Sequence, residues 1–362
     1  MATTMQQFTG ATTSESPKSS VRFDRLMIIF VCWFAGGLFI DGWAHNHGLV
    51  DKTFFTPWHA ILYTGYAANA VLLLGTLIRN HLRGQSWSEA IPDGYQLALL
   101  GVPVFAIAGV GDLVWHTLFG FEVGIEPLLS PTHLLLAFSA VLIMSGPLRA
   151  AMRRDTPLET QDWATLLPAI LSLTAVFSVF TFFTSFANPF VQTWTLQATF
   201  DAGKELGAAS ILLLAAIQMG VILVALRRWK LPIGTLTLVF TINVALMGVF
   251  KDNYALIPGA TVAGLIADFL LWRLQPSTER PEVLRFFAFS VPVIFFLCYF
   301  LPIILSIGIT WKAHLWLGSC VMAGTIGLGL SYLLIAPRGP VAETASRSLF
   351  AANRVQDSEK SD

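Results

Sequence analysis

The feature that most constrains this chain is a series of long apolar segments covering most of its 362 residues. Each is close to the roughly 20 residues that a helix needs to cross the hydrocarbon of a bilayer. Lipid cannot hydrogen-bond to an exposed backbone, and the segments are far longer than barrel strands, so helices are predicted. Ten segments qualify, at about 24–43, 57–78, 96–117, 131–151, 164–186, 205–226, 233–250, 256–273, 284–308 and 312–336.

Composition supports a chain whose solvent is lipid. Hydrophobic residues make up 55% of the sequence and charged residues only 12%, about half the charge of an ordinary soluble protein. The net charge of zero gives no global field that would favour a nucleic-acid partner. The predicted fold is therefore all-α, a polytopic transmembrane bundle of about ten helices in contact with the lipid bilayer.

The two ends of the sequence differ from this apolar body. Residues 1–22 are rich in Ser, Thr and Gln, and residues 337–362 are polar with mixed charges. Both are predicted to be disordered cytoplasmic tails. They flank a transmembrane domain at 23–336.

The distribution of basic residues predicts the orientation in the membrane. Short cytoplasmic loops retain Lys and Arg, whereas translocated loops lack them. The loops after the odd-numbered segments hold four of the 22 basic residues, and the tails and even-numbered loops hold the other 18. We therefore expect a multi-pass protein of the cell membrane with both termini in the cytoplasm.

An internal repeat occurs in the first part of the domain. The sequence Asp41-Gly-Trp-Ala-His45 precedes Asp112-Leu-Val-Trp-His116 by 71 residues. Each is followed by an outer loop and then by a proline and a histidine, in Thr56-Pro-Trp-His59 and Ser130-Pro-Thr-His133. These matches predict two duplicated helical hairpins, near 24–78 and 96–151, and a bundle built from repeated hairpins.

The spacing within each copy brings a carboxylate and imidazoles together. Asp and His four residues apart project from one face of a helix at adjacent turns. In the next helix, Thr or Ser is predicted as N-cap, proline as N1 and histidine as N3. The helix dipole disfavours an imidazolium at N3 and so favours a neutral imidazole, which is a metal ligand.

Each hairpin thus offers a candidate metal site, made of Asp41, His45 and His59 in the first copy and of Asp112, His116 and His133 in the second. The donors suit copper, zinc or iron, as one dinuclear site or two mononuclear ones. Haem ligation, a proton relay, or simple hydrogen bonding between the Asp and His side chains are the alternatives.

Several other polar residues are candidates for lesser roles. Glu122 and Glu126, in the second outer loop, are candidate catalytic bases, and His47 and His314 are possible extra ligands. Asp268 lies about 10 residues inside the eighth segment, where a carboxylate is costly and often functional. It is a candidate ion or proton relay, or else a structural partner of another polar side chain.

The Asp-x3-His motif followed by a histidine at the start of the next helix resembles the copper-binding motif in the C subunit of particulate methane and ammonia monooxygenases. The resemblance implies copper ligation by Asp41, His45 and His59, and by Asp112, His116 and His133. Here 13 residues separate His45 from His59 and 16 separate His116 from His133, slightly more than in that family, and the motif occurs twice. The resemblance does not extend beyond these motifs.

Two classes of function follow from these observations. The first is a membrane metalloenzyme, with copper-dependent oxidation of an apolar or lipidic molecule as the favoured chemistry and zinc-dependent hydrolysis as its variant. The second is a transporter or metal carrier in which the outer histidines capture an ion and Asp268 marks its route.

Overall fold

The computed structural model describes residues 19–49, 55–120, 124–154 and 161–335. Most of the tail predicted at 1–22, and all of the tail predicted at 337–362, lie outside these ranges. Within them the chain forms helices and turns with no strand, in the order α1 (Val21–Asn46), α2 (Pro57–Leu82), α3 (Gln96–Phe119), α4 (Glu126–Leu129), α5 (Pro131–Met144), α6 (Gly146–Arg153), α7 (Trp163–Phe183), η2 (Ser185–Ala187), η3 (Thr193–Gln197), α8 (Asp201–Arg228), α9 (Thr235–Val249), η4 (Tyr254–Leu256), α10 (Ile257–Leu274), α11 (Pro281–Ser306) and α12 (Ala313–Leu334).

All ten predicted segments contain a helix, but fewer than ten qualify as membrane spans. In the described part of the chain, eight helices are long and apolar enough to cross a bilayer, and a ninth span results if the bent pair α5 and α6 is counted as one. The all-helical membrane fold is therefore confirmed, and the expected number of about ten spans is not.

Two local features explain the difference. Helix α5 stops at Met144, where the Ser145 hydroxyl bonds to the Val141 carbonyl, and Pro147 then prevents the continuation of the same helix. The chain bends by 40° at this point. Helix α9 has only 15 residues, about 22 Å of helix against roughly 30 Å of hydrocarbon.

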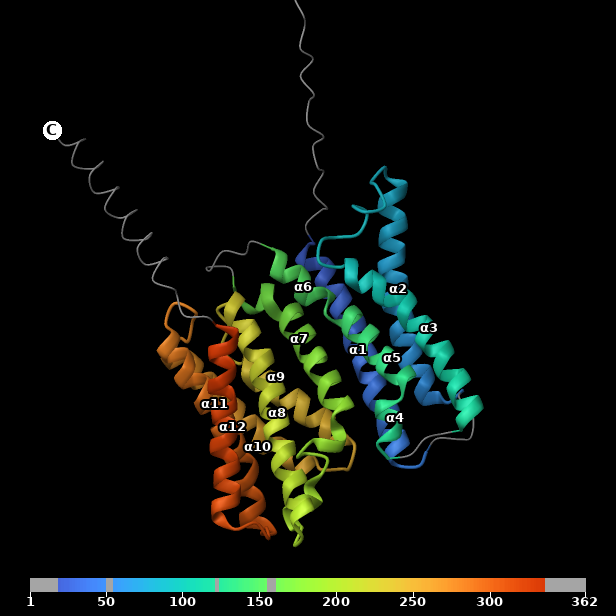
Figure 1. The fold of residues 1–362 in the computed structure, drawn as a ribbon. Coiled ribbons are helices and arrows are strands. Elements are labelled where there is room, and N and C mark those ends of the chain that lie inside the picture. Colours follow the sequence, from blue (N-terminus) through green and yellow to red (C-terminus); the bar gives the residue numbers. More distant parts are fainter. Residues whose placement is uncertain (1–18, 50–54, 121–123, 155–160, 336–362) are drawn as a thin grey trace, which may run out of the picture.

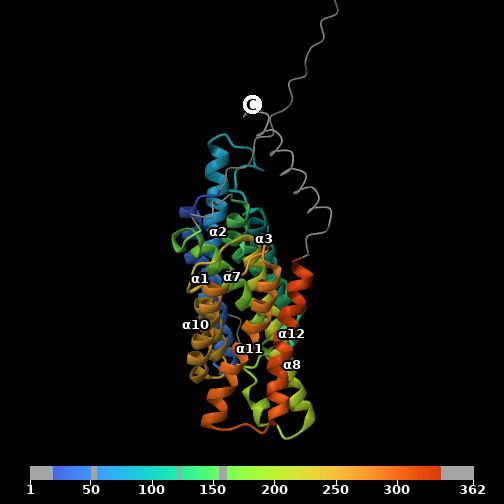
Figure 2. The ribbon, with the colours of Figure 1, turned by 90° about the vertical axis from the view of Figure 1, so that its left-hand side faces the viewer.

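The helices run along one common direction and form two groups joined by α7 (Figures 1 and 2). Helices α1, α2, α3 and α5 lie on one side of α7, and α8 to α12 lie on the other (Figure 1). Helix α1 begins at the end of the bundle where α12 ends, so both described ends of the chain lie at the same end (Figure 1).

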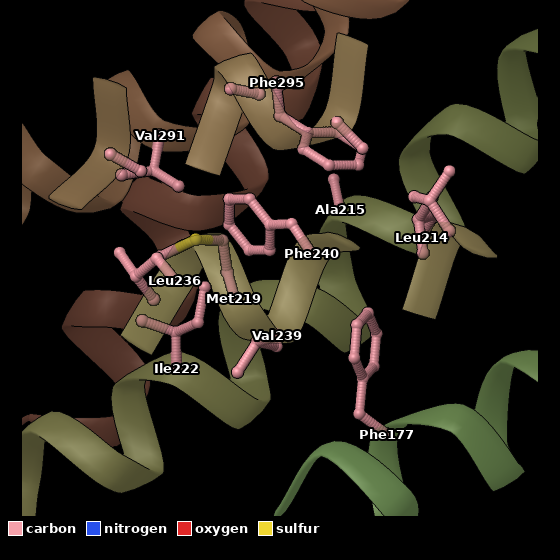
Figure 3. Close-up of a cluster of buried hydrophobic side chains, with 14 of the residues drawn as sticks. Phe177, Leu214, Ala215, Met219, Ile222, Leu236, Val239, Phe240, Val291 and Phe295 are labelled. Carbon is pink, nitrogen blue, oxygen red and sulfur yellow. The ribbon is translucent and has the colours of Figure 1, made fainter. Parts of the chain in front are cut away.

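Each group has its own hydrophobic core, and α7 contributes to both. Phe34, Phe105 and Ile143 belong to the core of the first group, which the α7 residue Val179 completes. The larger core extends from α7 to α12. Figure 3 shows Phe177, Met219, Phe240 and Phe295 meeting in it from four different helices. The shared helix α7 therefore fixes the first hairpins against the second group.

Helices α1 and α2 approach closely because glycines stand at their contact. A Cβ atom on Gly37 would lie 2.7 Å from the Leu62 Cα, and one on Gly65 would lie 2.7 Å from the Phe34 Cα. Such small residues let membrane helices pack backbone against backbone. The distance between α1 and α2 depends on these two glycines, and so does the distance between the side chains at the outer ends of the two helices.

Asp268 is buried and holds the N-terminus of α9. Its carboxylate accepts hydrogen bonds from the backbone N–H groups of Leu236 (3.1 Å) and Thr237 (2.8 Å) and from the Thr237 hydroxyl (2.6 Å). The first N–H groups of a helix have no partner within the helix and favour a negative charge. These donors account for the buried carboxylate without an ion or a relay.

We expect Gly37→Ala to lower the stability of the protein in detergent by about 1–3 kcal/mol, because the new methyl group forces α1 and α2 apart. Thermal unfolding monitored by circular dichroism measures the effect. Gly36→Ala is the control, since a Cβ there meets nothing within 4 Å. Equal melting temperatures for the two variants would show that the close approach does not matter for stability.

Asp268→Asn should destabilise the protein by about 1–3 kcal/mol, because the amide keeps the shape of the carboxylate but loses its charge and part of its accepting capacity. The control is Asp201→Asn, since the Asp201 side chain is 92% exposed at the start of α8. The stability of both variants is measured by unfolding in a denaturing detergent. Equal unfolding curves for the two variants would contradict the capping role.

Candidate metal centre

The first candidate site is formed by the end of α1 and the start of α2. We call Asp41, His45 and His59 the first triad. The Nε2 atom of His45 lies 3.8 Å from one Asp41 oxygen, and the Nε2 atom of His59 lies 3.5 Å from the other. His59 and Asp41 are buried, whereas His45 is more exposed.

The second candidate site repeats this arrangement between α3 and α5. We call Asp112, His116 and His133 the second triad. The Nε2 atoms of His116 and His133 lie 3.6 Å and 3.4 Å from the same Asp112 oxygen. This site is the more enclosed of the two, since Asp112 is only 2% exposed.

The local backbone places the last histidine of each triad as the sequence predicts. Thr56 caps α2 and accepts a hydrogen bond from the backbone N–H of His59 at 3.1 Å. Ser130 caps α5 in the same way and accepts from the backbone N–H of His133 at 3.5 Å. The predicted N-caps, the N1 prolines and the N3 histidines are confirmed in both copies.

The Nε2–oxygen distances within each triad are longer than hydrogen bonds and close to the separation of two ligands of one metal ion. A hydrogen bond between nitrogen and oxygen is about 2.7–3.2 Å long, shorter than all four Nε2–oxygen distances. Ligands at about 2.0–2.1 Å from a tetrahedral metal lie roughly 3.3–3.4 Å from one another. One ligand atom from each member of a triad lies within 4.8 Å of the others, so each triad can hold one ion.

The second ring nitrogen of two histidines faces other groups. His116 Nδ1 lies 3.3 Å from the Gly120 carbonyl oxygen, which can only accept, so Nδ1 carries the proton in that contact. His133 Nδ1 lies 2.7 Å from the Ser130 hydroxyl. Metal-bound histidines are commonly held by such a partner on the other nitrogen, which leaves Nε2 for the metal.

The two triads differ in what else holds their carboxylate. The hydroxyl of Thr132 donates to the Asp112 oxygen at 3.0 Å. In the first hairpin the equivalent residue is Trp58, whose indole donates to the Leu49 carbonyl at 3.2 Å instead. Asp41 Oδ1 is consequently buried without a hydrogen-bond partner among the described residues. A cation in the first triad would satisfy this oxygen.

Both triads line a single cavity of about 840 Å³. Apart from the triads its lining is largely apolar and includes Phe34, Phe105, Leu136 and Phe182. Lys251 and Asn253 from the α9–η4 connection also contribute, so the second helix group helps to enclose it. Both triads therefore lie on one largely apolar cavity.

Tyr63, which was not predicted from the sequence, also lines this cavity. Tyr63 lies one helical turn after His59, and the two rings are 6.3 Å apart. The spacing of four residues from His59 was the available signal, because it predicts that the two side chains share a face of α2.

Two further histidines lie outside the triads. His47 contacts the Trp43 carbonyl through Nδ1 at 2.8 Å and the Asp252 carboxylate through Nε2 at 3.0 Å. The hydrogen bond with Asp252 raises the pKa of His47 and lowers the pKa of Asp252, since it stabilises the charged pair. His314 is exposed at the start of α12 and does not line the cavity.

Two of the three other acidic candidates, Glu126 and Asp268, are also separate from the triads. Glu126 is exposed at the start of α4, although its neighbours Ile125 and Pro127 line the cavity. Glu122 lies outside the described residues. Asp268 does not line the cavity, and its carboxylate is engaged by α9.

No protein-family model matches the chain, and comparison with curated proteins and with solved structures gives no significant match. The functional interpretation of the triads therefore depends on their geometry and on the local resemblance of their motif.

Proposed function

We propose that this protein is an integral membrane metalloprotein in which each triad binds one transition-metal ion. The observation that carries the proposal is the set of Nε2–oxygen distances of 3.4–3.8 Å, which recurs in two separate hairpins. The buried Oδ1 of Asp41, which lacks a hydrogen-bond partner among the described residues, supports it, because a cation there would offset the cost of burying a carboxylate oxygen.

We further propose that the protein is an oxidoreductase, with copper as the favoured metal and an apolar or lipidic molecule as substrate. Two imidazoles and one carboxylate leave coordination positions open on an ion, and a copper ion there would supply one-electron and oxygen chemistry. The largely apolar chamber binds the hydrophobic part of the substrate and limits the access of water. The copper preference itself follows from the motif resemblance.

Zinc-dependent hydrolysis is the second candidate, because two histidines and a carboxylate are also the ligands of some catalytic zinc sites. A carrier function is less favoured. It needs a polar route from the triads through the bundle, and the donors of α9 occupy the carboxylate of Asp268 that was considered for such a route.

The distribution of basic residues supports a location of the triads at the extracytoplasmic face. Both described ends of the chain lie at the end of the bundle that is opposite the last turn of α1 and the first turn of α2 (Figure 1). With the basic tails in the cytoplasm, the substrate and the metal would reach the chamber from the bilayer or from outside the cell.

Metal analysis tests the proposal directly. Protein purified without chelators and without a polyhistidine tag, and then loaded with copper, zinc or iron and desalted, should retain about two ions per chain by mass spectrometry. His59→Ala and His133→Ala should each retain about one ion, and the double variant should retain none, because each substitution removes one of three ligands.

His314→Ala is the matched control, since this exposed histidine lies outside the cavity and its loss should leave two ions. A wild type that retains no metal after loading would overturn the proposal. The identity of the metal that binds at stoichiometric amounts during expression then distinguishes copper chemistry from zinc hydrolysis.

A further inference from the structure

Tyr63 connects the two hairpins inside the shared cavity. It follows His59 by one turn of α2, and its ring lies edge-on to the His59 ring. From there the side chain extends towards α3, where its ring packs 5.9 Å from that of Phe105. It thus begins next to the first triad and ends against the helix that carries two members of the second.

A glycine in α3 makes room for the hydroxyl of Tyr63. A Cβ atom on Gly109 would lie only 2.9 Å from this oxygen. Gly109 precedes Asp112 by three residues and therefore lies on the same side of α3, close to the second triad. The absence of a side chain at this position lets the hydroxyl approach α3.

Tyr63 shares its cavity with both triads. Asp41 and Asp112, one from each triad, line the same cavity, together with the four imidazoles of the triads. A phenol O–H is a hydrogen-bond donor, a kind of group that the carboxylates and the metal-bound Nε2 atoms do not add to the cavity.

Tyr66 is a second tyrosine of the same helix, and it lies outside the cavity. It also extends from α2 to α3, but its hydroxyl donates to the Val102 carbonyl at 2.8 Å and its ring stacks on Phe105 with 4.5 Å between centroids. Tyr66 does not line the cavity. The two tyrosines therefore share an element and a neighbour and differ in their access to the triads.

We propose that the Tyr63 hydroxyl is a hydrogen-bond donor shared by the two triads. It donates to a small anionic or oxygen-containing ligand that occupies the open metal positions on the side where the triads face each other. Tyr63 thereby makes the two sites act on one bound molecule, and Gly109 keeps the hydroxyl in place. This inference rests on the proposed metal binding and assigns a residue that neither motif contains.

The test uses inorganic azide as the probe of the full-length, copper(II)-loaded protein in detergent. Azide bound to copper(II) produces a charge-transfer absorption band, whose titration gives the azide dissociation constant. Tyr63→Phe should retain two copper ions and raise the azide dissociation constant about tenfold, the size expected for the loss of one hydrogen bond to a charged acceptor. Tyr66→Phe should leave both the copper content and the azide affinity at the wild-type values.

Gly109→Ala provides a second variant, because its methyl group displaces the hydroxyl without removing it. It should also weaken azide binding, and it should have little further effect when Tyr63 is already Phe. Such non-additivity assigns the effect to the hydroxyl and not to a general change in packing.

Three outcomes would overturn the assignment of Tyr63. These are an unchanged azide affinity in copper-loaded Tyr63→Phe, an equal loss in Tyr66→Phe, and wild-type protein that binds copper but no azide. In each case the copper content still supports the proposed function. Wild-type protein that binds no copper, zinc or iron would instead overturn the proposed function, and the role of Tyr63 with it.

Discussion

Asp112 is almost completely buried near the end of a membrane helix, and an ionised carboxylate in such a place needs a cation or several donors around it. One hydroxyl, from Thr132, donates to it, and two imidazoles stand at 3.4 and 3.6 Å. A metal ion between the carboxylate and the two imidazoles, as proposed above, would satisfy all three groups at once.

Close packing of the helices brings the histidines of each triad together. The histidines of each triad come from two helices, and their rings meet only where those helices approach closely, at 5.8 Å in the first triad and 5.6 Å in the second. Gly37 and Gly65 allow that approach between α1 and α2. Helix α7 then supports the hairpins against the second group, which encloses the chamber.

The parts of the site that the sequence could predict are those determined by local hydrogen bonding. An i, i+4 pair and a capped helix start have the same geometry wherever they occur, so the spacing of Asp41 and His45 and the position of His59 were sufficient. The convergence of both triads on one cavity depends on packing between distant segments. So do the contact of Tyr63 with Gly109 and the capping of α9 by Asp268, and no short-range pattern reports them.

The number of membrane spans also depends on features that the apolar pattern does not show. A count of apolar residues does not distinguish a straight helix from one that is interrupted, and it joined α5 and α6 across Ser145 and Pro147. It also gave α9 the status of a full span, although its 15 residues end where the chain turns to enclose the cavity. Both segments contain a hydrogen bond between a side chain and the backbone. The Ser145 hydroxyl donates to the Val141 carbonyl at the end of α5, and the Thr237 N–H donates to Asp268 at the start of α9.

The two hairpins share a capped helix start with a histidine at N3, but other groups hold their carboxylates differently. This difference bears on the proposed metal binding. Thr132 fixes Asp112 before any ion binds, which lowers the cost of organising the second triad. Trp58 provides no such bond to Asp41, whose buried Oδ1 has no hydrogen-bond partner among the described residues. His45 is also the most exposed residue of the first triad. Under the proposed metal binding, the second triad is therefore the preorganised site, and the first is the one whose carboxylate changes most when an ion binds. Two ions in this cavity would consequently have unequal environments.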